Sequence, residues 1–140
     1  MLKGMAHLAL TVKDMEKSLD FYCKALGFKK AFEIERPNTG GPWIVYLHLA
    51  DRQFVELFYN GTEDNPWNSA QRGFNHVCFE VDDIQKAAEH IKSSGYELDS
   101  EPKMGVDNNW QCWVKDPDGV RVELMQISPD SPHAKAILGQ

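Results

Sequence analysis

The chain repeats a pair of chemically distinctive residues, and this repetition constrains its fold more than any other feature. His7 and His76 lie 69 residues apart, each near the start of an alternating apolar segment. Glu56 and Glu123 lie 67 residues apart, each with apolar residues on both sides. Strand–helix pairs recur by chance in many proteins, but matched histidines and glutamates in both copies point to an internal duplication.

Each half of the chain is predicted to contain a strand, a helix and three further strands, from hydrophobic periodicity and turn chemistry. In the first half we expect a strand at 5–12, a helix from Asp14 to Gly27, and strands at 28–36, 43–49 and 53–59. In the second half we expect a strand at 74–81, a helix capped by Asp82 or Asp83 and ended by Gly95, and strands at 96–100, 110–115 and 120–127. The last two strands of the second half are joined by the type I turn 116–119. Residues 128–140 are expected to form a tail or a short terminal helix.

Size and composition favour one small globular domain. A chain of 140 residues is the size of a typical single domain. We expect module one at about 4–60, module two at about 73–127 and the tail at 128–140, with 60–73 as connector. The net charge of −6 argues against nucleic acid or membrane partners and favours a small-molecule substrate. Three separated cysteines, no leader pattern and no membrane-length apolar run favour a cytoplasmic protein.

Alternation along the strands indicates which face of its strand each of the four matched residues occupies. His7 and His76 fall on the face opposite the residues that would pack under a helix. Glu56 and Glu123 lie inside apolar strands, where a carboxylate is costly to bury unless it is paired. Either glutamate could instead face solvent, and either histidine could be a hydrogen-bonded core residue. Four such residues in symmetric positions favour one divalent ion per site, which could be Ni, Zn, Co, Mn or Fe.

Other candidates carry a weaker signal. Cys78 and Glu80 share the face of His76 by parity. The four tryptophans could line a pocket, although large aromatic residues are more often in a core or an interface. His48 has no matched partner, and His133 lies in the predicted tail.

Several segments resemble the vicinal oxygen chelate superfamily, which includes glyoxalases, bleomycin resistance proteins and dioxygenases. The resemblance extends to Ile127, and its most specific part is the Asp-Pro-Asp-Gly turn at 116–119, followed by Glu123. The segments that carry it are 6–10, 18–22, 26–28, 75–77 and 116–124. It implies an α+β fold of two βαβββ modules that form a concave mixed sheet around a metal cleft, with helices on the outer face. It also implies a homodimer, with each site built from His7 and Glu56 of one chain and His76 and Glu123 of the other. The sequence alone leaves open a monomer that closes its own site.

Within the family, the set His7, Glu56, His76 and Glu123 is similar to that of glyoxalase I (lactoylglutathione lyase). Methylmalonyl-CoA epimerases typically have Gln in place of Glu56, extradiol dioxygenases lack that ligand, and bleomycin-binding members usually lack the whole set. The resemblance implies a metal-dependent lyase or isomerase that acts on a hemithioacetal or 2-hydroxycarbonyl substrate through an ene-diolate. Glu123 is the expected base, and Glu56 is the second carboxylate. The alternatives are a methylmalonyl-CoA or sugar-acid epimerase or isomerase, a dioxygenase, or a non-catalytic protein that binds a small molecule such as an antibiotic.

The candidate substrate residues are Thr11, Asn60, Cys78 and Glu80. Thr11 stands where glyoxalase I typically has an arginine that holds a glutathione carboxylate. Asn60 matches a family asparagine, whereas Gly61 replaces the tryptophan that often follows it. Because a bidentate anion contact is lost at Thr11, a thiol other than glutathione and a different hydroxycarbonyl compound are both open.

Overall fold

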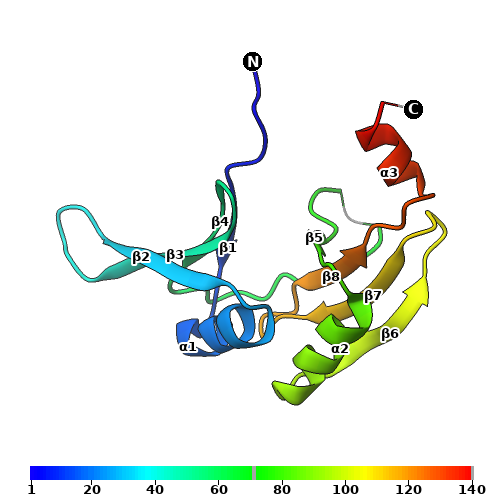
Figure 1. The fold of residues 1–140 in the computed structure, drawn as a ribbon. Coiled ribbons are helices and arrows are strands. Elements are labelled where there is room, and N and C mark those ends of the chain that lie inside the picture. Colours follow the sequence, from blue (N-terminus) through cyan, green and yellow to red (C-terminus); the bar gives the residue numbers. More distant parts are fainter. Residues whose placement is uncertain (71, 140) are drawn as a thin grey trace. The chain divides into compact units, whose positions relative to one another are not determined.

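The computed structural model describes residues 1–70 and 72–139. The chain divides into two compact units, Met1–Asn65 and Pro66–Gln140 (Figure 1). The boundary between them lies inside the segment 60–73 that the sequence predicts to be a connector. That the two modules form one domain stays a prediction.

The first unit is a four-stranded sheet with one helical segment. Its elements are β1 (His7–Thr11), α1 (Met15–Leu19), the π-helical η1 (Asp20–Ala25), β2 (Lys29–Glu35), β3 (Pro42–Ala50) and β4 (Gln53–Phe58). The strands lie in the order β1-β4-β3-β2. β1 runs parallel to β4, and the other neighbours are antiparallel. The strands predicted for this half are confirmed to within two residues at each end.

The helical segment begins as predicted and then widens. The side chain of Asp14 accepts a hydrogen bond from a backbone N–H of the first turn, which makes it the N-cap. In η1 the N–H of Leu26 bonds to the carbonyl of Phe21, five residues earlier, which is π-helical spacing. Phe21 and Tyr22 are both fully buried, with their rings edge to face and 5.1 Å between centroids. Gly27, at φ 79°, ends the segment.

The second unit repeats the topology of the first. Its elements are β5 (Val77–Glu80), α2 (Ile84–Ser93), β6 (Leu98–Met104), β7 (Trp110–Lys115), β8 (Arg121–Gln126) and α3 (Pro132–Ile137). The strands lie in the order β5-β8-β7-β6, with β5 parallel to β8. Asp83 caps α2, so the second of the two predicted cap positions is used. Residues 128–140 were expected to form either a tail or a short terminal helix, and the structure contains the helix α3 there.

Two strands of the second unit differ from prediction. β5 begins at Val77 rather than at 74, so His76 immediately precedes the strand. β6 begins two residues later than expected, because the N–H of Tyr96 still bonds to the carbonyl of Ile91 at the end of α2. β6 also continues to Met104 through Pro102, which an edge strand tolerates because its outer side needs no N–H donor.

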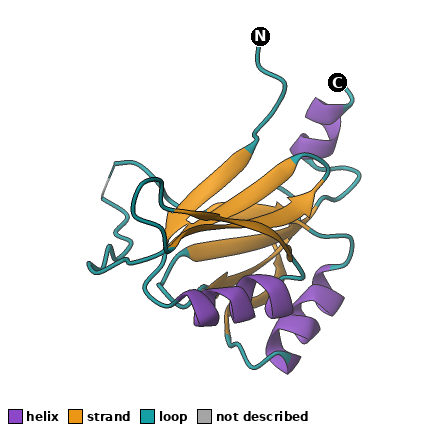
Figure 2. Ribbon diagram, turned by 90° about the vertical axis from the view of Figure 1, so that its left-hand side faces the viewer, coloured by secondary structure: helices purple, strands orange, loops and turns teal. Residues whose placement is uncertain are grey.

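Burial alternates along the first strand of each unit as the pattern predicts. In β1, His7, Ala9 and Thr11 are exposed while the residues between them are half-buried. In β5, Val77 and Phe79 are buried while Cys78 and Glu80 are exposed. Strands predominate over helices in both units, and loops connect them (Figure 2). The two sheets are mixed and do not close on themselves, which confirms the α+β class.

Candidate functional site

The first unit buries a carboxylate on the sheet face that carries His7. Glu56 in β4 is 6% exposed and stands opposite Ala9 of β1 and Tyr46 of β3. Its Oε1 lies 3.3 Å from Nδ1 of His7. The hydroxyl of Tyr46 donates a hydrogen bond to the Glu56 carboxylate, and this bond is the main reason that the pKa of Tyr46 is raised. One imidazole and one carboxylate therefore lie together in this unit.

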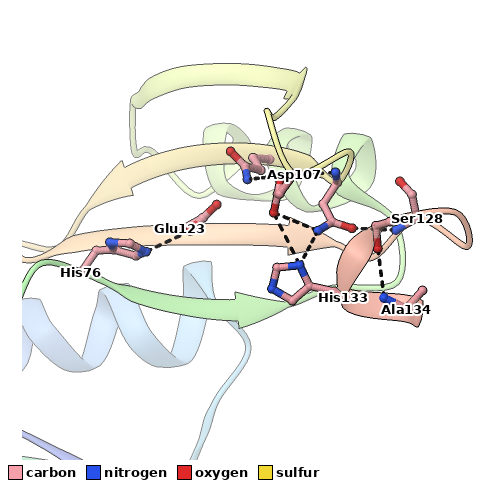
Figure 3. A network of polar contacts seen from close by, with 9 residues as sticks. His76, Asp107, Glu123, Ser128, His133 and Ala134 are labelled. Carbon is pink, nitrogen blue, oxygen red and sulfur yellow. Dashed lines mark hydrogen bonds and ion pairs between the residues drawn. The ribbon is translucent and has the colours of Figure 1, made fainter. Parts of the chain in front are cut away.

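The second unit contains the same arrangement. Glu123 in β8 is 4% exposed and stands opposite Cys78 of β5 and Trp113 of β7. Its Oε2 lies 3.0 Å from Nε2 of His76 (Figure 3). The ring of His76 also meets the ring of Trp113 nearly edge to face, with 4.8 Å between centroids. Both glutamates thus lie on equivalent strands, β4 and β8. Each of these strands is flanked by the parallel strand (β1 or β5) and by an antiparallel strand (β3 or β7).

The spacing within each pair suits two ligands of one cation. The basic group paired with Glu56, and likewise with Glu123, is an imidazole. Two ligand atoms bonded at about 2.1 Å to one divalent ion lie about 3.0 Å apart at right angles and about 3.4 Å apart at tetrahedral angles. The observed separations, 3.3 Å and 3.0 Å, match this range. The donor set therefore fits a divalent metal.

The structure presents the four predicted ligands as two pairs, one in each unit. Within residues 1–70 and 72–139, no three His, Cys, Asp or Glu side chains form a group that could hold a metal ion. Each pair is consequently half of the predicted ligand set. A complete coordination shell requires ligands from more than one pair, or water.

Cys78 lies beside the Glu123 carboxylate on the open face of its sheet. Partial desolvation, followed by the negative charge of Glu123, raises the pKa of Cys78 to about 12. The thiol is therefore protonated at neutral pH and is a poor nucleophile there, since the thiolate is the reactive form.

The other predicted substrate residues lie at the ends of strands. Thr11 is exposed at the end of β1, on the face of His7. Asn60 follows β4 in the left-handed region, with φ 72°, which asparagine tolerates better than most residues. Glu80 is exposed at the end of β5, opposite Met125, and its charge contributes to the raised pKa of Cys78.

Asn75, which contacts His76, and Arg121, which contacts Asn75, were not predicted as part of the site. Asn75 Oδ1 lies 2.7 Å from Nδ1 of His76 and accepts a 3.1 Å hydrogen bond from Nη1 of Arg121. The guanidinium carbon of Arg121 lies 4.1 Å from the ring centroid of Trp67 and 4.7 Å from that of Trp113. The available signal was proximity in sequence, because Asn75 adjoins His76 and Arg121 lies two residues before Glu123 on the same strand face.

A second polar network anchors the terminal helix and was also not predicted (Figure 3). Asn109 is fully buried, and its Nδ2 lies 2.9 Å from Asp107 Oδ2 and 2.9 Å from His133 Nδ1. Its Oδ1 accepts a 3.0 Å hydrogen bond from the N–H of Ser128. His133, placed in the tail by the sequence pattern, is thereby tied to the loop between β6 and β7.

Asn109→Ala should lower the free energy of unfolding by about 2–3 kcal/mol, because it leaves buried polar groups without partners. Urea denaturation followed by far-UV circular dichroism measures this change. His133→Ala removes the contacts of an exposed side chain with Asn109 and Asp107 and should cost less than about 1 kcal/mol. Equal losses for the two variants would show that Asn109 is not the centre of the network.

In the described ranges 1–70 and 72–139, no helix combines the length and the apolarity needed to cross a membrane.

Comparison with known proteins agrees with the fold. The sequence matches the Glyoxalase/Bleomycin resistance protein/Dioxygenase superfamily over residues 4–124. A probable lactoylglutathione lyase from Synechocystis sp. is 29% identical over 89% of this chain and 95% of its own length. A lactoylglutathione lyase from Pseudomonas putida is 32% identical over 88% of this chain and 84% of its own length. A glyoxalase I mutant from Zea mays superposes with a TM-score of 0.73 at 28% identity, covering 89% of this chain and 44% of that structure. The chain belongs to the glyoxalase/bleomycin resistance/dioxygenase superfamily, the vicinal oxygen chelate proteins.

Proposed function

We propose that this protein is a metal-dependent lyase of the glyoxalase I type, which converts a hemithioacetal into a 2-hydroxyacyl thioester. The observation that carries the proposal is the pair of buried carboxylate–imidazole contacts at equivalent positions of two sheets, 3.3 Å between Glu56 and His7 and 3.0 Å between Glu123 and His76. The relatives named lactoylglutathione lyase support the same reaction class.

His7, Glu56, His76 and Glu123 would hold the metal. When bound, a divalent ion supplies Lewis acidity toward two adjacent substrate oxygens and makes the neighbouring C–H more acidic. Ni, Zn, Co, Mn and Fe(II) all accept imidazole and carboxylate ligands. Because each unit provides one pair, we propose a homodimer in which His7 and Glu56 of one chain complete a site with His76 and Glu123 of the other. Cytoplasmic localisation stays a prediction.

Glu123 is the proposed general base. It removes the proton from the substrate carbon that bears sulfur and returns a proton to the adjacent carbon, passing through an ene-diolate. Hydrogen bonding supports this choice, because Glu56 is engaged by the hydroxyl of Tyr46. Glu123 is instead hydrogen-bonded by the thiol of Cys78, a weaker donor. Its lone pairs are therefore more available to a substrate proton.

The first unit favours a substrate with an apolar or aromatic remote part. Phe32 and Tyr46 stack with 4.3 Å between ring centroids, in the same cross-strand row as Glu56. Phe32 is 47% exposed, so an aromatic surface is open on this face. Thr11, on the same face, offers no guanidinium for a carboxylate. Both features support a thiol cosubstrate less anionic than glutathione.

A panel of thiols tests the function and its substrate together. Purified protein loaded with Ni²⁺, Co²⁺, Zn²⁺ or Mn²⁺ is given methylglyoxal with glutathione or with uncharged aliphatic and aromatic thiols, and thioester formation is followed by ultraviolet absorbance. We expect turnover, with a higher kcat/KM for the uncharged thiols than for glutathione. Absence of a thioester with every thiol and every metal would overturn the lyase assignment, and a preference for glutathione would overturn only the substrate assignment.

A further inference from the structure

The guanidinium of Arg121 contacts two indole rings and donates a hydrogen bond to a neighbouring amide. It lies 4.1 Å from the Trp67 centroid and 4.7 Å from the Trp113 centroid, an arrangement that restricts both the position and the rotation of the group. Its Nη1 is 3.1 Å from Oδ1 of Asn75. Arg121 is therefore placed to fix the side chain that contacts His76.

Donor and acceptor chemistry then determines the state of His76. Arginine has only donors, so the asparagine atom that faces Arg121 must be its oxygen. That same oxygen lies 2.7 Å from Nδ1 of His76, and because an amide oxygen can only accept, Nδ1 must carry a hydrogen. In a neutral imidazole the lone pair is then on Nε2, the atom 3.0 Å from the Glu123 carboxylate. A ring nitrogen lone pair and a carboxylate are thus directed at one region, as metal ligands require.

We propose that Arg121, acting through Asn75, is a positioning residue that fixes the orientation and tautomer of His76 for metal binding. The inference rests on the metal centre of the proposed function. It assigns three residues a shared role: Trp67 and Trp113 hold the guanidinium, and Asn75 transmits its orientation to the imidazole.

The first unit lacks this relay, meaning the contacts from Arg121 through Asn75 to His76, although it repeats the His–Glu pair. Ala6 precedes His7 where Asn75 precedes His76, and Phe54 lies two residues before Glu56 where Arg121 lies two before Glu123. In that unit the equivalent contact is made by the backbone, as the N–H of Phe54 donates to the carbonyl of Ala6 at 3.0 Å. The relay is therefore specific to the half that carries the proposed base.

Arg121→Gln tests the relay, because glutamine can accept as well as donate and so no longer forces the oxygen of Asn75 toward His76. We expect Zn²⁺ affinity, measured by competition with a chromophoric chelator, to fall about 10-fold, within the range typical of outer-shell partners. In the Zn²⁺-loaded, ¹⁵N-labelled protein the Nδ1–H proton of His76 should be slowly exchanging in the wild type and exchange-broadened in the variant. Arg52→Gln removes the same charge from an exposed turn and should change neither readout.

A rescue variant separates orientation from folding. Aspartate at position 75 presents only acceptors, so Asn75→Asp combined with Arg121→Gln should recover Zn²⁺ affinity and the slow Nδ1–H exchange. Failure of this rescue, or wild-type affinity in Arg121→Gln itself, would overturn the positioning role. Failure of the wild-type protein to bind Zn²⁺ would instead overturn the metal centre of the proposed function, so the two failures are distinguishable.

Discussion

Replacing Glu123 with glutamine is expected to reduce kcat for the best hemithioacetal by about 10²–10⁴-fold, the usual contribution of a general base. Glutamine has nearly the same shape and can still offer a carbonyl oxygen to a metal, but it cannot take up the substrate proton. The loss should therefore persist when the metal is saturating. Steady-state kinetics at several metal concentrations, with metal content measured on the same samples, provides the test.

Glu56→Gln is the matched control, because Glu56 occupies the equivalent position of the other sheet and makes the equivalent imidazole contact. It should weaken metal binding to a similar degree while retaining more turnover at saturating metal. Equal losses of kcat in the two variants would remove the distinction between base and second carboxylate. Full turnover in Glu123→Gln would show that another group takes the proton.

The four residues could be proposed as ligands from sequence because strand geometry is regular. A period of two residues fixes which side chains share a face, and a glutamate with apolar neighbours on both sides stands out in such a pattern. Glu56 and Glu123 are indeed buried, at 6% and 4% exposure, together with their apolar neighbours on both sides. Duplication strengthened the inference, since each half provided an independent copy of the same pattern.

The relay behind His76 could not be predicted in the same way. Arg121 and Asn75 lie 46 residues apart in sequence, and their contact depends on the pairing of β8 with β5. Trp67 lies outside the strands, where no periodicity indicates the direction of its side chain. The network around Asn109 has the same origin, because its partner His133 comes from a helix after the last strand.

The π-helical turn η1 shows a second feature that the sequence pattern could not predict. A helical period of 3.6 predicts that Leu19 and Leu26 share the buried stripe with Tyr22. In the structure both leucines are half-buried, while Phe21 is fully buried beside Tyr22. One wider turn changes which side chains face the core, and a strict period of 3.6 does not predict where such a rare turn occurs.

Removing the metal is expected to abolish thioester formation and to destabilise the fold at the same time. Without a cation, Glu56 and Glu123 stay buried, and the only basic group beside each is an imidazole, which is costly for a carboxylate. At a free metal concentration of about 100 times Kd, bound metal should add about 3 kcal/mol to the free energy of unfolding. Turnover and urea denaturation are measured before chelator dialysis, after it, and after the metal is restored.

Histidine variants show whether the effect arises at the proposed centre. His76→Ala should have low turnover and reduced stability from the outset, and the chelator should change neither any further, because one ligand and its outer-shell contacts are already gone. His90→Ala, which alters an exposed residue of α2, should respond to chelator as the wild type does. A His76→Ala protein that still loses turnover and stability on chelation would place the essential metal elsewhere, whereas a wild-type protein indifferent to chelation would require a reaction that uses no bound metal.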